Sequence, residues 1–160
     1  MNYDEFLLRP HPFFKGMCES HLRLLANNAR QVHFPAGTRI FHEGDPAEHF
    51  YLILRGKVVL QAHSAGRSVP IQTIGSGEVL GWSWLFPTYC WHFDARAEGD
   101  TDALSFPATQ LRDDCETDKT FGYALLKQIA ELLIQRLQAT RLKLVQAHKT
   151  ERHAALPIGG

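Results

Sequence analysis

Two short stretches rich in tryptophan, at 81–84 and 91–92, carry the residue types in this sequence best suited to binding chemistry. Indole rings can enclose a flat ligand by stacking. The backbone around a glycine and a serine can donate hydrogen bonds to an anion, and a protonated histidine adds positive charge. These residue types predict a site for a small, flat, anionic ligand. Its expected members are Gly81, Trp82, Ser83, Trp91 and His92.

The same tryptophans also fit an interpretation without a ligand. The three indoles of the chain, at Trp82, Trp84 and Trp91, are large enough to fill a pocket and to pack beneath a helix. His92 would then be an ordinary surface or core residue. The residue types alone leave both interpretations open.

Other kinds of site are poorly supported by the sequence. Cys90 and His92 are two potential metal or haem ligands, but pairs of this kind are common by chance. The cysteines at positions 18, 90 and 115 are odd in number and scattered, which does not suit a disulfide framework, a C-x-x-C metal site or an iron–sulfur cluster. No Gly-x-Ser-x-Gly, His-Glu-x-x-His or phosphate-loop motif is present. We therefore expect no metal, no catalytic residues and no enzyme activity.

The composition indicates one globular domain over residues 1–160. Hydrophobic residues make up 44% of the chain, and 17 basic residues balance 17 acidic ones, so bulk charge does not indicate nucleic-acid binding. No charged leader precedes an apolar run, and no window approaches the roughly 20 apolar residues that span a bilayer. The sequence predicts a cytoplasmic protein with reduced thiols and no membrane contact.

The elements that must position the tryptophans change in character along the chain. Helical spacing of Leu22, Leu25 and Ala29 predicts an N-terminal helix over 11–31. From 34 to 107, short runs rich in Val, Ile, Leu, Phe and Tyr alternate with turn residues such as Gly44 and Gly66. Many short strands without intervening helices are typical of an antiparallel sandwich or barrel.

A long helix is expected over 118–148. Apolar residues recur at steps of three and four, and no proline or glycine interrupts the run from Leu125 to Ala147. A helix of that length exceeds the width of a small barrel, so part of its apolar stripe needs a partner. A second copy of the helix is the simplest partner, and we expect a homodimer through 118–148. Residues 149–160 are expected to form a flexible tail.

Three stretches of the sequence resemble the cyclic-nucleotide-binding domain family, and most closely the sensor half of catabolite-activator-type bacterial regulators. They read FPAGTRIFHEGDPAE (34–48), FYLILRGKV (50–58) and GEVLG (77–81). The resemblance implies a mainly β fold with flanking α-helices. It implies an antiparallel β-roll, jelly-roll-like (a double-stranded β-helix), with N-terminal helices and a long C-terminal helix.

In that family, a phosphate-binding cassette follows the third stretch. It begins Phe-Gly-Glu, whose Glu takes the ribose hydroxyl, and a later Arg-Ser or Arg-Thr neutralises the cyclic phosphate. This sequence keeps Gly81, but it has Trp82 in place of the Glu and Trp91-His92 in place of Arg-Ser. Losing a charged hydrogen bond to a phosphate costs about 1.5–3 kcal/mol. The cassette is degenerate, and altered or lost cyclic AMP binding is expected.

Two functions follow as hypotheses. The first is a stand-alone regulatory sensor for a cyclic nucleotide or another small anion, which acts on a protein partner that the sequence does not identify. The second is a non-sensing interaction or dimerisation module whose relic pocket is filled by tryptophans. Residues 147–160 are too few for a helix-turn-helix domain, so no direct DNA binding is expected. Arg96, the next cation along the chain, is expected to pair with Asp94 or another carboxylate.

Overall fold

The computed structural model describes residues 5–155 and contains two compact units, Met1–Ala124 and Leu125–Gly160, which are treated separately below. The first unit opens with α1 (Glu5–Leu8), a single 3-10 turn, η1 (Pro12–Phe14), and α2 (Glu19–Asn28). The single domain expected over 1–160 stays a prediction.

The helix predicted over 11–31 is wrong at both ends. At its start, Pro12–Phe14 forms only one 3-10 turn, and Gly16 has a left-handed backbone with φ +83°, which an α-helix does not accommodate. At its end, the chain has already become a strand at Arg30. That strand is held by pairing with a distant segment, in which Val32 lies opposite Ala103. Non-local pairing therefore overrides the local helical pattern.

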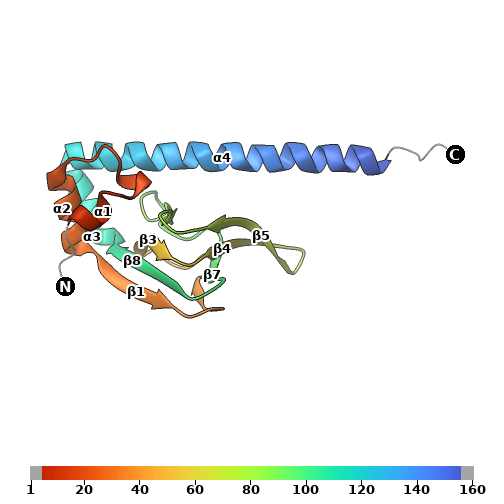
Figure 1. Ribbon diagram of the computed structural model, residues 1–160, viewed down its shortest axis with the longest axis horizontal. Helices are drawn as coiled ribbons and strands as arrows, with labels where there is room; N and C mark the ends of the chain where they lie inside the picture. Colours follow the sequence, from red (N-terminus) through yellow and green to blue (C-terminus); the bar gives the residue numbers. More distant parts are fainter. Residues whose placement is uncertain (1–4, 156–160) are drawn as a thin grey trace. The chain divides into compact units, whose positions relative to one another are not determined.

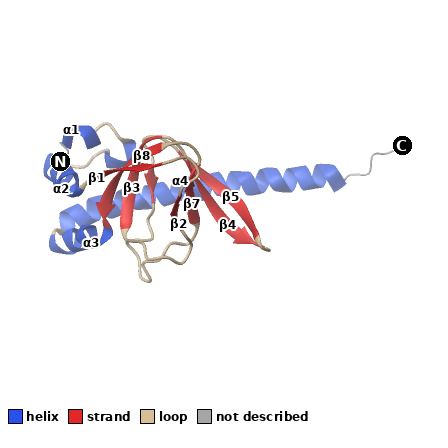
Figure 2. Ribbon diagram, turned by 90° about the horizontal axis from the view of Figure 1, so that it is seen from below, coloured by secondary structure: helices blue, strands red, loops and turns tan. Residues whose placement is uncertain are grey.

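The strands form two four-stranded antiparallel sheets with the orders β1-β8-β3-β6 and β2-β7-β4-β5 (Figures 1 and 2). The strands are β1 (Arg30–Phe34), β2 (Arg39–Phe41), β3 (His49–Arg55), β4 (Val58–Ser64), β5 (Arg67–Ile74), β6 (Val79–Leu80), β7 (Asp94–Ala97) and β8 (Thr101–Pro107). This confirms the predicted fold class, an antiparallel β-roll with flanking helices. The roll begins at Arg30, slightly before the expected residue 34.

Aromatic rings join the first sheet to the N-terminal turn. Phe50 and Phe106 lie opposite each other in β3 and β8, with ring centroids 5.7 Å apart. Phe13 approaches Phe50 at 5.4 Å, and Phe14 approaches Phe106 at 6.4 Å. Each large apolar side chain buried in this way contributes about 1.5–3 kcal/mol to stability. The alternation of β3 therefore fixes which of its faces the N-terminal turn covers.

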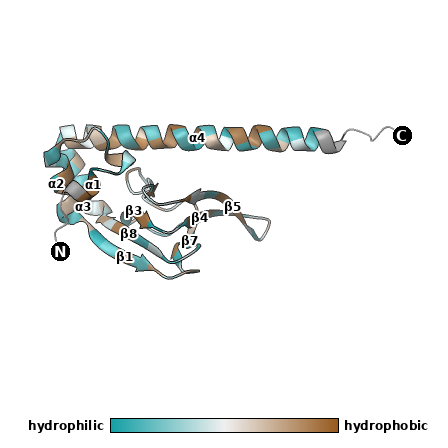
Figure 3. Ribbon diagram, viewed as in Figure 1, coloured by the Kyte–Doolittle hydropathy of each residue, from teal (hydrophilic) through white to brown (hydrophobic). Residues whose placement is uncertain are grey.

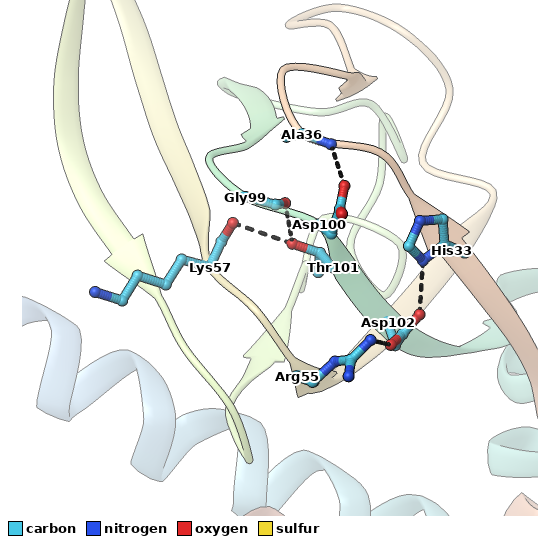
Figure 4. Close-up of polar contacts among 8 residues, drawn as sticks. All are labelled: His33, Ala36, Arg55, Lys57, Gly99, Asp100, Thr101 and Asp102. Carbon is cyan, nitrogen blue, oxygen red and sulfur yellow. Dashed lines mark hydrogen bonds and ion pairs between the residues drawn. The ribbon is translucent and has the colours of Figure 1, made fainter.

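The turn between β3 and β4 requires a glycine. Gly56 has φ +104°, and a Cβ added there would lie 2.5 Å from the Thr101 hydroxyl oxygen. That hydroxyl donates to the carbonyls of Gly99 at 2.9 Å and Lys57 at 3.3 Å (Figure 4). The β3–β4 turn is thus pressed against the β7–β8 turn, and any side chain at position 56 would separate them.

Two carboxylates close the same end of the roll (Figure 4). Asp100 accepts a hydrogen bond from the backbone N–H of Ala36 at 2.9 Å. Asp102 lies between His33, at 2.7 Å, and Arg55, at 2.8 Å. The hydrogen bond with His33 and the charge of Arg55 lower the pKa of Asp102. These contacts join β1, β3 and β8 where the strands end.

The two C-terminal helices are α3 (Ala108–Thr117) and α4 (Lys119–Ala155), and Asp118 between them caps α4. Its Oδ1 accepts from the backbone N–H groups of Thr120 and Phe121, both at 3.1 Å. Helices α3 and α4 approach closely at this junction, because a Cβ added at Gly122 would lie 2.8 Å from the Cys115 carbonyl oxygen. Burial, together with the neighbouring carboxylates of Asp114 and Glu116, raises the pKa of the Cys115 thiol to about 11.

Helix α4 is longer than the predicted 118–148. It continues to Ala155, so the flexible tail expected over 149–160 is wrong for 149–155, and 156–160 lie outside the described residues. No proline or glycine occurs between Leu125 and Ala155 to end the helix. None of the described helices has the length and apolar character needed to cross a membrane.

In the second unit, hydrophobic residues of α4 alternate with hydrophilic ones along the helix (Figure 3). Leu137 is 69% exposed and Leu144 is 71% exposed. Such residues are normally scattered singly on a surface, whereas here they recur along one helix.

Candidate functional site

All five predicted site residues lie in one segment, 81–93, which we call the tryptophan loop. It begins after β6, a strand of the first sheet, and ends before β7, a strand of the second. The loop therefore passes from one sheet of the roll to the other. Its two ends are fixed by the pairing of β6 with β3 and of β7 with β2 and β4.

Gly81 and Trp91 are in direct contact. Gly81 has φ +97°, and a Cβ added there would lie 2.6 Å from Cη2 and Cζ3 of Trp91. The indole also stacks on Phe41, with centroids 3.7 Å apart and planes 6° from parallel. Trp91 is only 3% exposed. It thus fills the space between Gly81 and Phe41, and only glycine at position 81 leaves room for it.

The backbone of Trp91 is held as firmly as its ring. Its N–H donates to the Asp45 carbonyl at 2.9 Å, and its carbonyl accepts from the Gly44 N–H at 2.8 Å. These bonds tie the tryptophan loop to the turn between β2 and β3, so Trp91 is fixed by partners that lie far away in the sequence.

Trp82 and His92 form a second pair. Their ring centroids are 5.8 Å apart at an interplanar angle of 74°, and Trp82 also meets Phe93 edge-on at 6.3 Å. Trp82 is half-buried and His92 is exposed. Unlike Gly81 and Trp91, this pair is therefore accessible to solvent.

Ser83 and its neighbour Trp84 are buried without hydrogen-bond partners for their side chains. Ser83 is 2% exposed and Trp84 is fully buried, with its ring against Phe50 at 5.6 Å. Within the described part of the chain, Ser83 Oγ and Trp84 Nε1 have no partner. An unsatisfied buried polar group costs about 1–3 kcal/mol. The structure thus brings the predicted residues together as two contacting pairs and a buried serine.

The middle of the tryptophan loop has a strained backbone. Thr88 and Tyr89 both have φ +48°, a left-handed conformation that is uncommon for residues other than glycine. Such residues cost of order 1–3 kcal/mol each and persist only where their surroundings hold them. One such contact is the hydrogen bond from the Ala47 N–H to the Tyr89 carbonyl, at 2.7 Å.

Arg112 of α3 contacts the tryptophan loop at two points. Its guanidinium lies over the Tyr89 ring, 4.3 Å from the centroid, and its Nη1 donates to the Trp84 carbonyl at 2.7 Å. Nothing local in the sequence links Arg112 to residues 84 and 89, so this contact could not be predicted from the sequence. Arg112 is thus a polar connection between the loop and α3.

Asp94, just after the loop, is a buried carboxylate with two partners, and it is only 1% exposed. Oδ1 accepts from the Glu43 N–H and Oδ2 lies by His63 Nε2, both at 2.7 Å. Burial alone would raise the pKa of Asp94, but these two contacts, together with the charge of Arg39, outweigh it and lower the pKa. The expected ion pair between Arg96 and Asp94 is wrong, because Glu43 and His63 already occupy the carboxylate.

A polar cavity of about 330 Å³ opens beside Trp91. Arg39, His42, His49 and Tyr51 contribute to its lining, with Trp91 as one wall. Burial, together with the Glu48 carboxylate, raises the pKa of Tyr51 to about 12, so the phenol stays neutral at physiological pH. The cavity gives a small molecule access to Trp91 from the side of β2 and β3.

The two potential metal ligands, Cys90 and His92, make contacts with other residues of the loop. The Cys90 thiol donates to the Thr88 carbonyl at 3.2 Å, and the His92 ring meets Trp82. Across the described residues, no group of three or more His, Cys, Asp or Glu side chains is arranged to hold a metal ion.

Known proteins resemble this chain in sequence. It is 28% identical over 99 residues to the cyclic AMP receptor protein of Thermus thermophilus, covering 61% of this chain and 46% of the relative. It is 32% identical over 84 residues to a CRP-like cAMP-activated global transcriptional regulator of Mycobacterium tuberculosis, covering 52% of this chain and 37% of the relative. The matches thus span less than half the length of these relatives.

The fold is shared with solved structures. A protein from Geobacter metallireducens, named as cyclic nucleotide-binding, superimposes with a TM-score of 0.76 at 27% identity, covering 86% of this chain and 99% of that one. The family described as the cyclic nucleotide-binding domain matches residues 31–118, from β1 through the tryptophan loop to the end of α3. This chain therefore belongs to the cyclic nucleotide-binding domain family.

Proposed function

We propose that this chain is a regulatory ligand-sensing domain whose binding of cyclic AMP is altered or lost. The observation that carries the proposal is the packing of Trp91, which lies between Gly81 and Phe41. Its position in the sequence is where the family's cassette has the arginine for the cyclic phosphate. A cyclic nucleotide bound in the family's manner would meet an indole there, and Trp82 would offer it no carboxylate.

The proposed site consists of Gly81, Trp82, Ser83, Trp91 and His92. Two features of the tryptophan loop support a site that changes state. Ser83 Oγ and Trp84 Nε1 are buried polar atoms without hydrogen-bond partners in the described part of the chain. A rearranged loop with a bound ligand would provide such partners. Thr88 and Tyr89 hold strained conformations whose release would offset part of the cost of rearrangement. The cavity beside Trp91 provides an approach for the ligand.

The signal would leave the site through α3. Arg112 donates to the Trp84 carbonyl and covers Tyr89, so a rearranged loop changes what holds α3. Helix α3 is followed, after the capping Asp118, by α4. The loop would then have two states, one with Arg112 bound to it and one with Arg112 released. A ligand shifts the equilibrium between these states only by its difference in affinity for them. We propose that it binds better to a loop in which Arg112 is released.

We propose further that the domain is a homodimer through 118–148 and has no enzyme activity of its own. The exposed apolar side chains of α4, including Leu137 at 69% and Leu144 at 71%, support a helix that is covered in the assembled protein. The α4 helix of a second copy carries the same exposed apolar side chains, so the two helices would form a self-complementary contact.

The tight packing of Trp91 also favours the second candidate, a non-sensing interaction module. If the indole never leaves its place between Gly81 and Phe41, the pocket is a filled relic and the roll serves to present α4 to partners. The two candidates differ in whether any small molecule stabilises the fold.

Thermal unfolding with a panel of ligands separates them. The panel contains cyclic AMP, cyclic GMP, cyclic dinucleotides, ATP and common anionic metabolites. A ligand at 100 times its dissociation constant adds about 2.7 kcal/mol, a shift in Tm of roughly 5–10 °C for a chain of this size. A shift with a ligand other than cyclic AMP supports the sensor. A full shift with cyclic AMP contradicts the altered site, and no shift at all favours the interaction module.

A further inference from the structure

Two arginines face each other on the outer surface of the second sheet. Arg39 of β2 and Arg96 of β7 are directly opposite in the register of the pair. Along β7, Ala95 and Ala97 are fully buried and alternate with the more exposed Arg96, which places Arg96 on the outer face of the roll. The Cβ atoms of directly opposed residues are about 4.5–5.5 Å apart, and like charges in that position are destabilising.

Asp94 attracts Arg39 without forming an ion pair with it, and the charge of Arg39 contributes to the lowered pKa of Asp94. Asp94 is the nearest acid along the same face of β7, but its oxygens are occupied by the Glu43 N–H and by His63. In the part of the chain that the structure describes, neither Arg39 nor Arg96 has an ion-pair partner within 4.0 Å. The side-chain contact of Arg39 is with the His42 ring, at Nδ1, at 3.0 Å.

Arg96 also lacks a hydrogen-bond acceptor. Its Nε is buried and has no partner among the described residues. A guanidinium nitrogen removed from water without an acceptor costs more than a neutral group in that position, because the group is charged. Opposed like charges and an unsatisfied buried donor indicate the same missing component, an anion with several acceptor oxygens.

We propose that the outer face of the β2-β7-β4-β5 sheet binds a phosphate-sized oxyanion between Arg39 and Arg96. Guanidinium groups suit this ligand, because their planar N–H donors match the oxygens of a phosphate in pairs. Arg39 also lines the cavity beside Trp91, so the site adjoins the tryptophan loop, but it does not depend on the proposed sensing function. The oxyanion is either free phosphate or the phosphoryl group of a small metabolite.

Inorganic phosphate is the first probe. It is titrated into the full chain at pH 7.5, with sodium chloride adjusted to hold ionic strength constant, while the arginine Nε–Hε signals are followed by NMR. We expect a saturable shift of the Arg96 and Arg39 signals, together with slower exchange of the Arg96 Hε. Ribose 5-phosphate forms the second arm. Equal affinity for both probes identifies the free ion as the ligand, and at least tenfold tighter binding of the ester identifies a phosphorylated metabolite.

Substitutions provide the control. Arg96→Gln and Arg39→Gln should each weaken phosphate binding by about 10- to 100-fold, the effect of losing a charged hydrogen-bonding group. Arg67→Gln removes an exposed arginine of β5, the strand at the other edge of the same sheet, and should leave binding unchanged. Arg39 is exposed, so its variant remains informative if Arg96→Gln fails to fold. Non-saturating shifts, or equal losses in the Arg67 variant, would overturn the proposal.

Discussion

The indole of Trp91 lies parallel to the ring of Phe41, 3.7 Å between centroids, and its far edge touches the α-carbon region of Gly81. These three residues come from β2, from the start of the tryptophan loop and from its end. The contact therefore joins both ends of the loop to the second sheet. A substitution at this contact therefore tests whether Trp91 packs rigidly inside the roll.

Gly81→Ala should destabilise the fold strongly, because its Cβ would lie 2.6 Å from a rigid indole at a backbone φ of +97°. We expect a loss of about 2–4 kcal/mol, from backbone strain together with overpacking. Chemical denaturation measures it. Gly66→Ala is the matched control, with φ +77° and open space around the new methyl group, and should cost only about 1 kcal/mol. Equal losses of unfolding free energy in the two variants would show that the Trp91 side chain moves aside at little cost.

Restoring the family's cassette should restore its ligand. The triple variant Trp82→Glu, Trp91→Arg, His92→Ser replaces two indoles and an imidazole with the groups that the family uses for ribose and phosphate. We expect it to bind cyclic AMP at least tenfold more tightly than the unmodified chain, as measured by calorimetry, since each charged hydrogen bond regained is worth about 1.5–3 kcal/mol. Trp82→Glu alone, without the cation, should bind no better than the unmodified chain. A folded triple variant without this gain would contradict the proposed reason for altered binding.

Arg112→Gln should loosen the tryptophan loop without unfolding the roll. It removes the 2.7 Å hydrogen bond to the Trp84 carbonyl and the contact with the Tyr89 ring. We expect about 1.5–3 kcal/mol less protection of the loop amides, measured by hydrogen exchange across 84–91. Gln110→Ala, on the same helix, should leave exchange in the loop unchanged. If the loop amides exchange equally fast in the two variants, the strained backbone at 88 and 89 is held by contacts other than those of Arg112.

Asp94 should contribute stability that depends on pH. Its pKa is lowered in the folded state, so its contribution is present above the unfolded value of 3.8 and is lost as the pH falls through the lower folded value. Asp94→Asn should therefore be less stable than the unmodified chain by about 1–3 kcal/mol at pH 7. The difference should shrink below about pH 4. Urea unfolding at a series of pH values measures it. Asp113→Asn, at an exposed position of α3, should show a smaller difference, and a gap for Asp94→Asn that stays constant with pH would refute the assignment.

Leu137→Lys should dissociate the proposed dimer. The side chain is 69% exposed on α4, and a charge there would be buried in the helix contact. Sedimentation velocity should show a shift from dimer to monomer. Gln135→Lys adds the same charge about 200° around the helix and should leave the dimer intact. A monomeric unmodified chain, or dissociation by both variants, would count against a contact through this face.

The sequence predicted the strands well, because their signals are local. The runs at 50–54, 58–62, 69–74 and 104–106 alternate with turn residues, and they lie in β3, β4, β5 and β8. The fold class also followed from the motifs of the family. The ends of the first helix were wrong because pairing of β1 with β8, some 70 positions away, decides them.

The arrangement of the site was less predictable for the same reason. The sequence identified the tryptophan loop, but the partner of Trp91 is Phe41, and no periodicity relates these positions. His63 and Arg112 reach Asp94 and Trp84 from other elements, so their roles appear only in the folded chain. Local sequence patterns indicate secondary structure, whereas the polar contacts across the roll join residues that come together only when the chain folds.

The course of the tryptophan loop, from a strand of one sheet to a strand of the other, limits how its length can vary. An insertion near Gly81 or Trp91 would shift the register of β6 or β7 and slide one sheet against its neighbour. Residues 86–89 are exposed and lie between the anchored ends, so extra residues could bulge outward there. Among relatives with the same glycine and tryptophan, gains and losses of residues should cluster at 86–89, and the spacing on either side should be constant.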